Sequence, residues 1–249
     1  MKVRNLYYHT VFKRTNSVKV FILQVFLALA SWFRVFIEVF TRKKFGERYF
    51  LFPLNIMLAV ILGIVPLGRY YGTPVLAIIF KNLTWYAYIV AFMIASYKRY
   101  LEVKREPSVF DFKRFSLSPG IIKKWLYKID LIGMKMTNRN ISIFVEPGIF
   151  MLIGMVLVAL QQDIGYLLIS SATVYGYSWA AQYYLGDQFI MDTIDQMIAN
   201  EELVNSFVHT RIPADTRGFE VDASKIKSRE FRRMVAENMM ESEPAVDVI

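Results

Sequence analysis

The sequence contains no cysteine, which excludes disulfide frameworks, thiolate metal sites and cysteine nucleophiles. Its only two histidines, His9 and His209, lie far apart and cannot form a metal or haem pair without other ligands. The phosphate-binding pattern GxxxxGK[ST], the zinc pattern HExxH and the nucleophile pattern GxSxG are also missing. We therefore predict no catalytic residue, no cofactor and no metal ligand, and we do not expect an enzyme.

What the chain does contain is apolar. Of its 249 residues 55% are hydrophobic and 16% aromatic, with a mean hydropathy of +0.33 and a net charge of +9. That content is too high for a disordered chain and unusual for a soluble domain. The apolar residues come in blocks that match about 30 Å of hydrocarbon. These features predict an all-α membrane protein.

Four blocks of predominantly apolar residues predict transmembrane helices. They are Phe50–Leu67, Pro74–Ser96, Ile141–Leu160 and Gly165–Leu185. The connections at 68–73 and 161–164 are short, which makes the joined helices antiparallel neighbours. The sequence therefore predicts two transmembrane hairpins, one in residues 49–96 and one in residues 141–185.

A fifth apolar stretch, Val18–Phe40, lies in the basic N-terminal region 1–48. Its uninterrupted part ends at Phe33, because Arg34 and Glu38 follow four residues apart and can pair on one helical face. Apolar runs of about 14 residues are typical of interfacial rather than spanning helices. We expect an amphipathic helix that lies flat on the membrane.

The distribution of positive charge predicts the topology. Residues 1–17 hold four Lys and Arg and no acid, residues 41–48 hold four against one, and residues 97–140 hold eleven against four. The two short connections contain only Arg69 and Asp163 as charged residues. Because cytoplasmic segments accumulate Lys and Arg, we expect four spans with both termini in the cytoplasm.

The basic cytoplasmic loop 97–140 contains an amphipathic pattern at 120–132 that predicts a helix. Its expected membrane-surface residues are Lys123, Lys124, Trp125 and Lys128. A basic amphipathic helix beside a membrane is typical of a surface that binds anionic lipid. The alternative is a docking surface for another protein. A third interpretation is a surface that binds nucleic acid, although we expect no direct contact of this kind.

Residues 186–249 form an acidic cytoplasmic tail, with 7 Lys and Arg against 13 Asp and Glu. From Asp187 to Val208 the tail has the apolar period of a helix. The expected contact residues for other protein subunits are Ile194, Met197, Ile198, Leu203 and Phe207. They can cover a helix of another chain or a second copy. The alternative is that this stripe folds back on the basic loop 97–140 of the same chain.

Polar residues inside the predicted spans are candidates for function, because ionisable groups are costly at membrane depth. Asn55 can form a hydrogen bond across the first hairpin, while Lys81, beside Asn82, can extend to the interface. Glu146 precedes Pro147 and can cap the third span or pair with Arg139. Four glycines are expected to let the last two spans pack closely, namely Gly148, Gly154, Gly165 and Gly176.

Three short strings resemble parts of small polytopic inner-membrane proteins from bacterial conjugation and type IV secretion gene clusters. They are FGERYF at Phe45–Phe50, FVEPG at Phe144–Gly148 and GYLLIS at Gly165–Ser170. The resemblance covers about half of the chain. It implies an accessory inner-membrane subunit, for which one place is beside the coupling ATPase that pumps DNA, and it implies no catalytic residue.

Together these features favour a non-enzymatic integral membrane subunit or scaffold of a larger complex in the bacterial inner membrane. The alternative is a small transporter or channel subunit, in which Lys81, Asn82 and Glu146 would serve the pathway. A membrane-bound enzyme comes third. A stable homo-oligomer would favour the pore, whereas co-purifying subunits would favour the scaffold.

Overall fold

The computed structural model of the protein describes residues 2–12, 16–69, 74–103, 117–129, 136–224 and 226–243. These residues are mostly helical, as expected for an all-α protein. The chain divides into two compact units. The central unit is Leu23–Tyr183, and the terminal unit joins Met1–Ile22 to Tyr184–Ile249. The first and last segments of the sequence therefore belong to one unit.

Helices form most of the central unit. They are α1 (Ser17–Thr41), α2 (Phe52–Arg69), α3 (Val75–Lys81), α4 (Leu83–Val103), α6 (Asn138–Asn140), the π-helix η3 (Ile141–Val145), α7 (Glu146–Ala159) and α8 (Ile164–Leu203). The helices α6, η3 and α7 follow one another without a break. The helices α1 and α8 also contribute residues to the terminal unit.

The apolar helices agree only in part with the four predicted spans. Two of them, Ser17–Thr41 and Asn138–Ala159, are long and apolar enough to cross a membrane. The predicted second span is broken, because α3 and α4 meet at Asn82 with a bend of 85° and would together make a third span. Four spans are therefore not confirmed. The flat placement of α1 stays a prediction, although the helix has the length and apolarity of a span.

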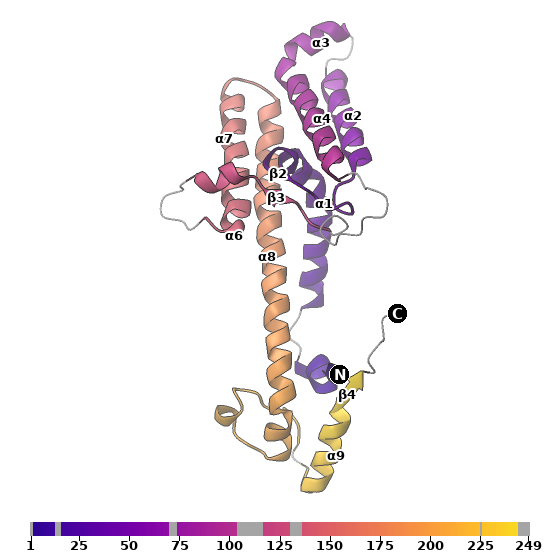
Figure 1. Ribbon diagram of the computed structural model, residues 1–249, viewed down its shortest axis with the longest axis vertical. Helices are drawn as coiled ribbons and strands as arrows, with labels where there is room; N and C mark the ends of the chain where they lie inside the picture. Colours follow the sequence, from indigo (N-terminus) through magenta and orange to yellow (C-terminus); the bar gives the residue numbers. More distant parts are fainter. Residues whose placement is uncertain are drawn as a thin grey trace. The chain divides into compact units, whose positions relative to one another are not determined.

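The helices α2 and α4 pack side by side, as Figure 1 shows. The Asn55 amide donates a hydrogen bond to the Ser96 hydroxyl at 3.3 Å, and both residues are buried. The Trp85 indole donates to the carbonyl of Leu62 at 2.8 Å. The expected polar contact of Asn55 across this helix pair is confirmed.

The helices α7 and α8 also lie side by side (Figure 1) and approach each other closely at two glycines. A Cβ atom on Gly165 would lie 2.5 Å from the carbonyl oxygen of Gly154, and one on Gly154 would lie 2.9 Å from that of Gly165. Gly176 approaches the carbonyl of Ile143, whereas a Cβ atom on Gly148 would meet no neighbouring atom within 4 Å. The packing role expected of these glycines is confirmed for all but Gly148.

The prediction of an amphipathic helix at 120–132 is wrong. Ile121–Ile122 form the strand β3, which pairs antiparallel with β2 (Arg42–Lys43), and Lys124–Lys128 form the short 3₁₀ helix η2. The buried side chains are those of Ile122 and Leu126, whereas Trp125 is half exposed. Ile132 lies outside the described residues. The backbone bonds of β2 replace the helical ones, so the apolar period of this segment does not decide its conformation.

The terminal unit has its own apolar core. Its elements are β1 (Lys2–Asn5), the π-helix η1 (Tyr8–Phe12), the end of α8, the π-helix η4 (Val204–Val208), the 3₁₀ helix η5 (Pro213–Asp215), α9 (Arg229–Met239) and β4 (Met240–Glu243). The strands β1 and β4 pair antiparallel. The core side chains are those of Tyr7, Tyr8, Ala199, Leu203, Phe207, Val208, Phe219 and Ala236.

The helix predicted for the first part of the tail is confirmed, and a further helix, α9, follows it. The helix α8 runs unbroken through the end of the predicted fourth span into the tail. The N-cap of α9 is Ser228, whose hydroxyl accepts a hydrogen bond from the Phe231 amide at 3.3 Å.

Candidate functional site

The most heavily charged part of the core is a set of two ion pairs in the central unit, Arg34–Glu38 and Arg42–Glu146, which we call the buried charge cluster. Arg42 follows α1 directly, and its guanidinium forms a forked contact with Glu146 at the start of α7. Arg42 is 2% exposed and Glu146 is fully buried. The Glu146 carboxylate also accepts a hydrogen bond from the Tyr175 hydroxyl at 2.6 Å, so α8 joins the cluster.

This contact corrects the role expected for Glu146. The helix that contains Glu146 begins further back, at Asn138, so Glu146 lies inside a continuous helix and caps nothing. Its partner is Arg42, which no local spacing indicates, and not Arg139. The second acceptor for Arg42 is the Ser142 hydroxyl, one helical turn before Glu146, at 2.8 Å. Arg42 therefore holds two successive turns of one helix.

The second pair of the cluster is the Arg34–Glu38 contact that the four-residue spacing predicts. The Arg34 Nε lies 3.0 Å from a Glu38 oxygen. Both side chains are buried, however, so this is no exposed pair on the polar face of an interfacial helix. Arg34 also donates to the side-chain oxygen of Gln182 on α8, and Glu38 accepts a hydrogen bond from the Tyr49 hydroxyl.

The Trp179 indole lies between the two arginines of the buried charge cluster. The guanidinium carbon of Arg34 lies 4.2 Å from the ring centroid, and that of Arg42 lies 4.1 Å from it. A ring face attracts a cation most strongly where water is excluded. The two arginines of the cluster thus share one aromatic side chain, and each is paired with a carboxylate.

The pKa values of Arg42 and of Tyr49, which bonds to Glu38, are both shifted upward. Burial alone lowers the pKa of Arg42, but the interactions with Tyr175 and Glu146 outweigh it, so the net pKa is raised. Burial, and then the Glu38 carboxylate, hold the pKa of Tyr49 well above its ordinary value. Arg42 stays charged and Tyr49 neutral, which suits a rigid connection between helices better than an acid or base.

The other polar residues expected inside the spans have different surroundings. Lys81 is exposed at the end of α3. Asn82 is buried at the break between α3 and α4, where its amide donates to the carbonyl of Ile78 at 2.9 Å. Asn82 also lines a cavity of about 660 Å³ whose lining is mainly apolar. Neither residue joins Glu146 in one site.

The residues expected at the membrane surface do not form a single basic face. Lys123 donates to the carbonyl of Phe40, and its pKa is lowered by burial and by nearby Arg99. Lys124, Trp125 and Lys128 belong to η2, whose buried side chain is Leu126. Lipid contact by this segment stays a prediction.

The five residues expected to contact a partner separate into two groups. Leu203 and Phe207 are buried in the core of the terminal unit, where Tyr7 and Tyr8 pack with them. Tyr8 donates a hydrogen bond to the Asp192 carboxylate at 2.7 Å, and burial, then Asp192, raises the pKa of this tyrosine. Ile194 and Met197 are exposed, whereas Ile198 is partly buried against the core. Sequence periodicity identified the helix but could not indicate which face the N-terminal tyrosines cover.

Across the described parts of the chain, no group of three or more His, Asp and Glu could hold a metal ion. Each carboxylate of the buried charge cluster is paired with an arginine. No protein-family model, curated protein or solved structure matches the chain. The fold itself defines the class, which is a mostly helical protein with two or three helices able to cross a membrane.

Proposed function

We propose that the protein is a non-enzymatic integral membrane subunit of a larger membrane complex, and that its terminal unit contacts the other subunits. The observation that carries the proposal is an exposed apolar stripe on the part of α8 that belongs to the terminal unit. Its residues, 43% to 58% exposed, are Ile190, Ile194 and Met197, which share one helical face. Phe189 and Met191, on either side of this face, are exposed as well. Contiguous exposed apolar side chains mark a surface that another molecule covers.

A protein covers this stripe more readily than lipid does. Asp187, Asp192 and Asp195 lie on the same segment of α8, and carboxylates are costly in hydrocarbon. A partner with an apolar helix and basic neighbours would match it. The three strings that resemble conjugation and secretion proteins suggest such a machine as the setting.

Single substitutions in the stripe test the proposal. We expect Ile194→Asp and Met197→Asp each to remove the co-purifying subunits, because a carboxylate would be buried without a partner in the interface. The measurement is the native mass of the complex extracted from its host in mild detergent. Both residues are exposed in the isolated chain, so its own stability should not change.

The matched control is Gln188→Asp, which adds the same charge at an exposed position of the same helix. It should leave the complex intact. A native mass that stays that of the complex in both stripe variants would contradict the proposal. A homo-oligomer of unchanged mass in every variant would instead support the transporter or channel alternative.

We further propose that both termini lie in the cytoplasm of a bacterial cell, with α2 and α4 forming one transmembrane hairpin and α7 and the first part of α8 the other. The supporting observation is the excess of Lys and Arg in residues 1–17, 41–48 and 97–140. The same basic segments would face anionic lipid of the inner leaflet.

Cysteine labelling of intact cells tests this topology, since the chain has no cysteine of its own. Single cysteines at the exposed positions Asn16 and Arg48 should be shielded from an impermeant reagent, whereas one at Leu160, after α7, should react. Reaction at position 16 with shielding at position 48 would show that α1 crosses the membrane and places the N-terminus outside.

A further inference from the structure

A cavity of about 660 Å³ lies in the terminal unit between η4 and α9. Cavities of this size commonly hold a small molecule. Both elements that form it are fixed by the same core, because Val208 of η4 and Ala236 of α9 are buried there. The cavity therefore has stable walls and belongs to one compact unit.

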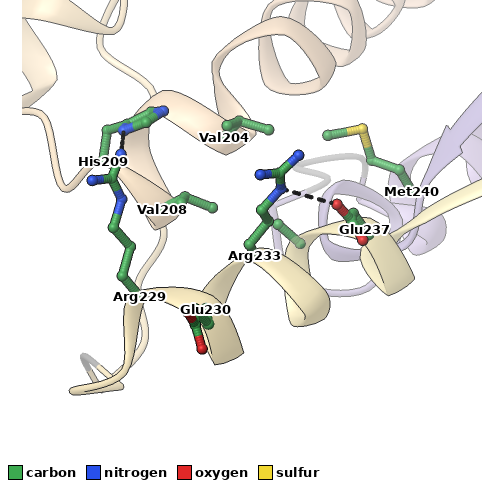
Figure 2. Close-up of a pocket in the computed structure, with 9 residues that line it drawn as sticks. Val204, Val208, His209, Arg229, Glu230, Arg233, Glu237 and Met240 are labelled. Carbon is green, nitrogen blue, oxygen red and sulfur yellow. Dashed lines mark hydrogen bonds and ion pairs between the residues drawn. The ribbon is translucent and has the colours of Figure 1, made fainter.

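One wall of the cavity is basic. Arg229 and Arg233 on α9 and His209 after η4 line it, as Figure 2 shows. The Arg229 guanidinium lies 3.2 Å from Nδ1 of His209. Because a guanidinium group has no hydrogen-bond acceptor, Nδ1 of His209 is the acceptor in this bond. The bond uses one N–H group of Arg229.

Two carboxylates, those of Glu230 and Glu237, also line the cavity. Arg233 contacts Glu237 through Nε alone, at 3.2 Å, and both side chains are mostly exposed, where such pairs are weak. In Figure 2 the Glu230 carboxylate points away from the guanidinium of Arg229. An anion that entered the cavity would meet the two guanidinium groups and the imidazole, beside the two carboxylates that also line the cavity.

Another part of the lining is apolar. Val204, Val208 and Met240 line it, and Val208 is almost completely buried. A small inorganic anion would use only the basic wall, and an uncharged apolar molecule would leave the basic wall without a partner. A ligand with a phosphate at one end and an apolar body at the other uses both walls, and arginine binds phosphate through two parallel N–H groups.

We propose that this cavity, the basic cavity, binds a phosphate ester with an apolar body, and that Arg229 and Arg233 hold the phosphate. Such a ligand can be a phospholipid or a soluble metabolite such as a nucleotide. The proposal does not depend on the partner subunits, since binding is measured on the full chain alone.

The test uses 1-naphthyl phosphate as the probe, followed by its fluorescence on titration of the full chain in detergent. We expect saturable binding, whereas 1-naphthol and inorganic phosphate should each bind about tenfold more weakly, because each lacks one half of the ligand. Arg229→Gln and Arg233→Gln should each lower the affinity for the probe about tenfold or more, because each variant loses a charge-assisted hydrogen bond to the phosphate. Equal binding of naphthol and naphthyl phosphate would overturn the proposal.

Lys227→Gln is the matched control, since it removes one positive charge two residues before Arg229 without changing the lining. This variant should bind the probe as tightly as the parent chain does. If it loses as much affinity as the two arginine variants, the loss reflects net charge alone and the proposed site is wrong. Competition by dihexanoyl phosphatidic acid would identify the lipid source, and competition by adenosine monophosphate the soluble one. If neither displaces the probe, the proposal fails.

Discussion

Replacement of Arg42 by alanine should destabilise the central unit by about 3–5 kcal/mol, the cost of leaving a buried carboxylate without its partner. Glu146 is fully buried, and Arg42 is its cationic partner. Without Arg42 the carboxylate keeps only the hydrogen bond from Tyr175, which does not neutralise its charge. The measurement is the thermal unfolding midpoint of the purified chain in detergent, which should fall steeply.

Two further variants separate the ion pair from a simple loss of bulk. The double variant Arg42→Met with Glu146→Gln removes both charges and should recover much of the stability, because an uncharged pair has no buried charge to leave unpaired. Arg48→Ala removes an exposed arginine of the same segment and should change the midpoint little. An Arg42→Ala midpoint equal to that of Arg48→Ala would refute the structural role of the cluster.

The buried charge cluster also shows where the sequence is informative and where it is not. The Arg34–Glu38 contact is local, so the four-residue spacing predicts it correctly. The Arg42–Glu146 contact joins residues 104 positions apart. No local sequence pattern links Arg42 to Glu146. The one available signal was Glu146 itself, since an ionisable residue in an apolar block requires a partner.

Helices are predicted well here, and their ends and breaks are not. Apolar length correctly locates α2 and the helix from Asn138 to Ala159, because a long apolar block has few alternatives to a helix. The break at Asn82 has no proline or glycine to mark it. At 120–132 the apolar residues have a helical period, but Ile121–Ile122 form a strand instead. The reason is that their backbone pairs with that of Arg42–Lys43.

The tail gives a third case, in which the helix was predicted but its neighbours were not. Leu203 and Phe207 have the period of an interface, yet they form a core with Tyr7 and Tyr8 from the other end of the sequence. Contacts between the two ends of a chain depend on the whole fold, and periodicity contains no information about them. The exposed Ile194 and Met197 are what remains of the expected partner surface.

Gly165→Ala is the second substitution with a large expected effect, about 3 kcal/mol of destabilisation, at the upper end of what overpacking usually costs. The new Cβ would lie 2.5 Å from the carbonyl oxygen of Gly154 and 2.7 Å from the amide nitrogen of Val158. Both are backbone atoms of α7 and cannot rotate away as a side chain does. The helices α7 and α8 would have to separate, which would also loosen the packing of Ile169 against Gly154.

Gly148→Ala is the matched control, since it makes the same change on α7 at a position with no neighbouring atom within 4 Å of the new Cβ. Because alanine favours a helix by about 1 kcal/mol over glycine, this variant should be as stable as the parent or more so. The thermal midpoints in detergent should therefore move in opposite directions. If both variants raise the midpoint, α7 and α8 are not in contact at Gly154 and Gly165, and the close packing of this helix pair is wrong.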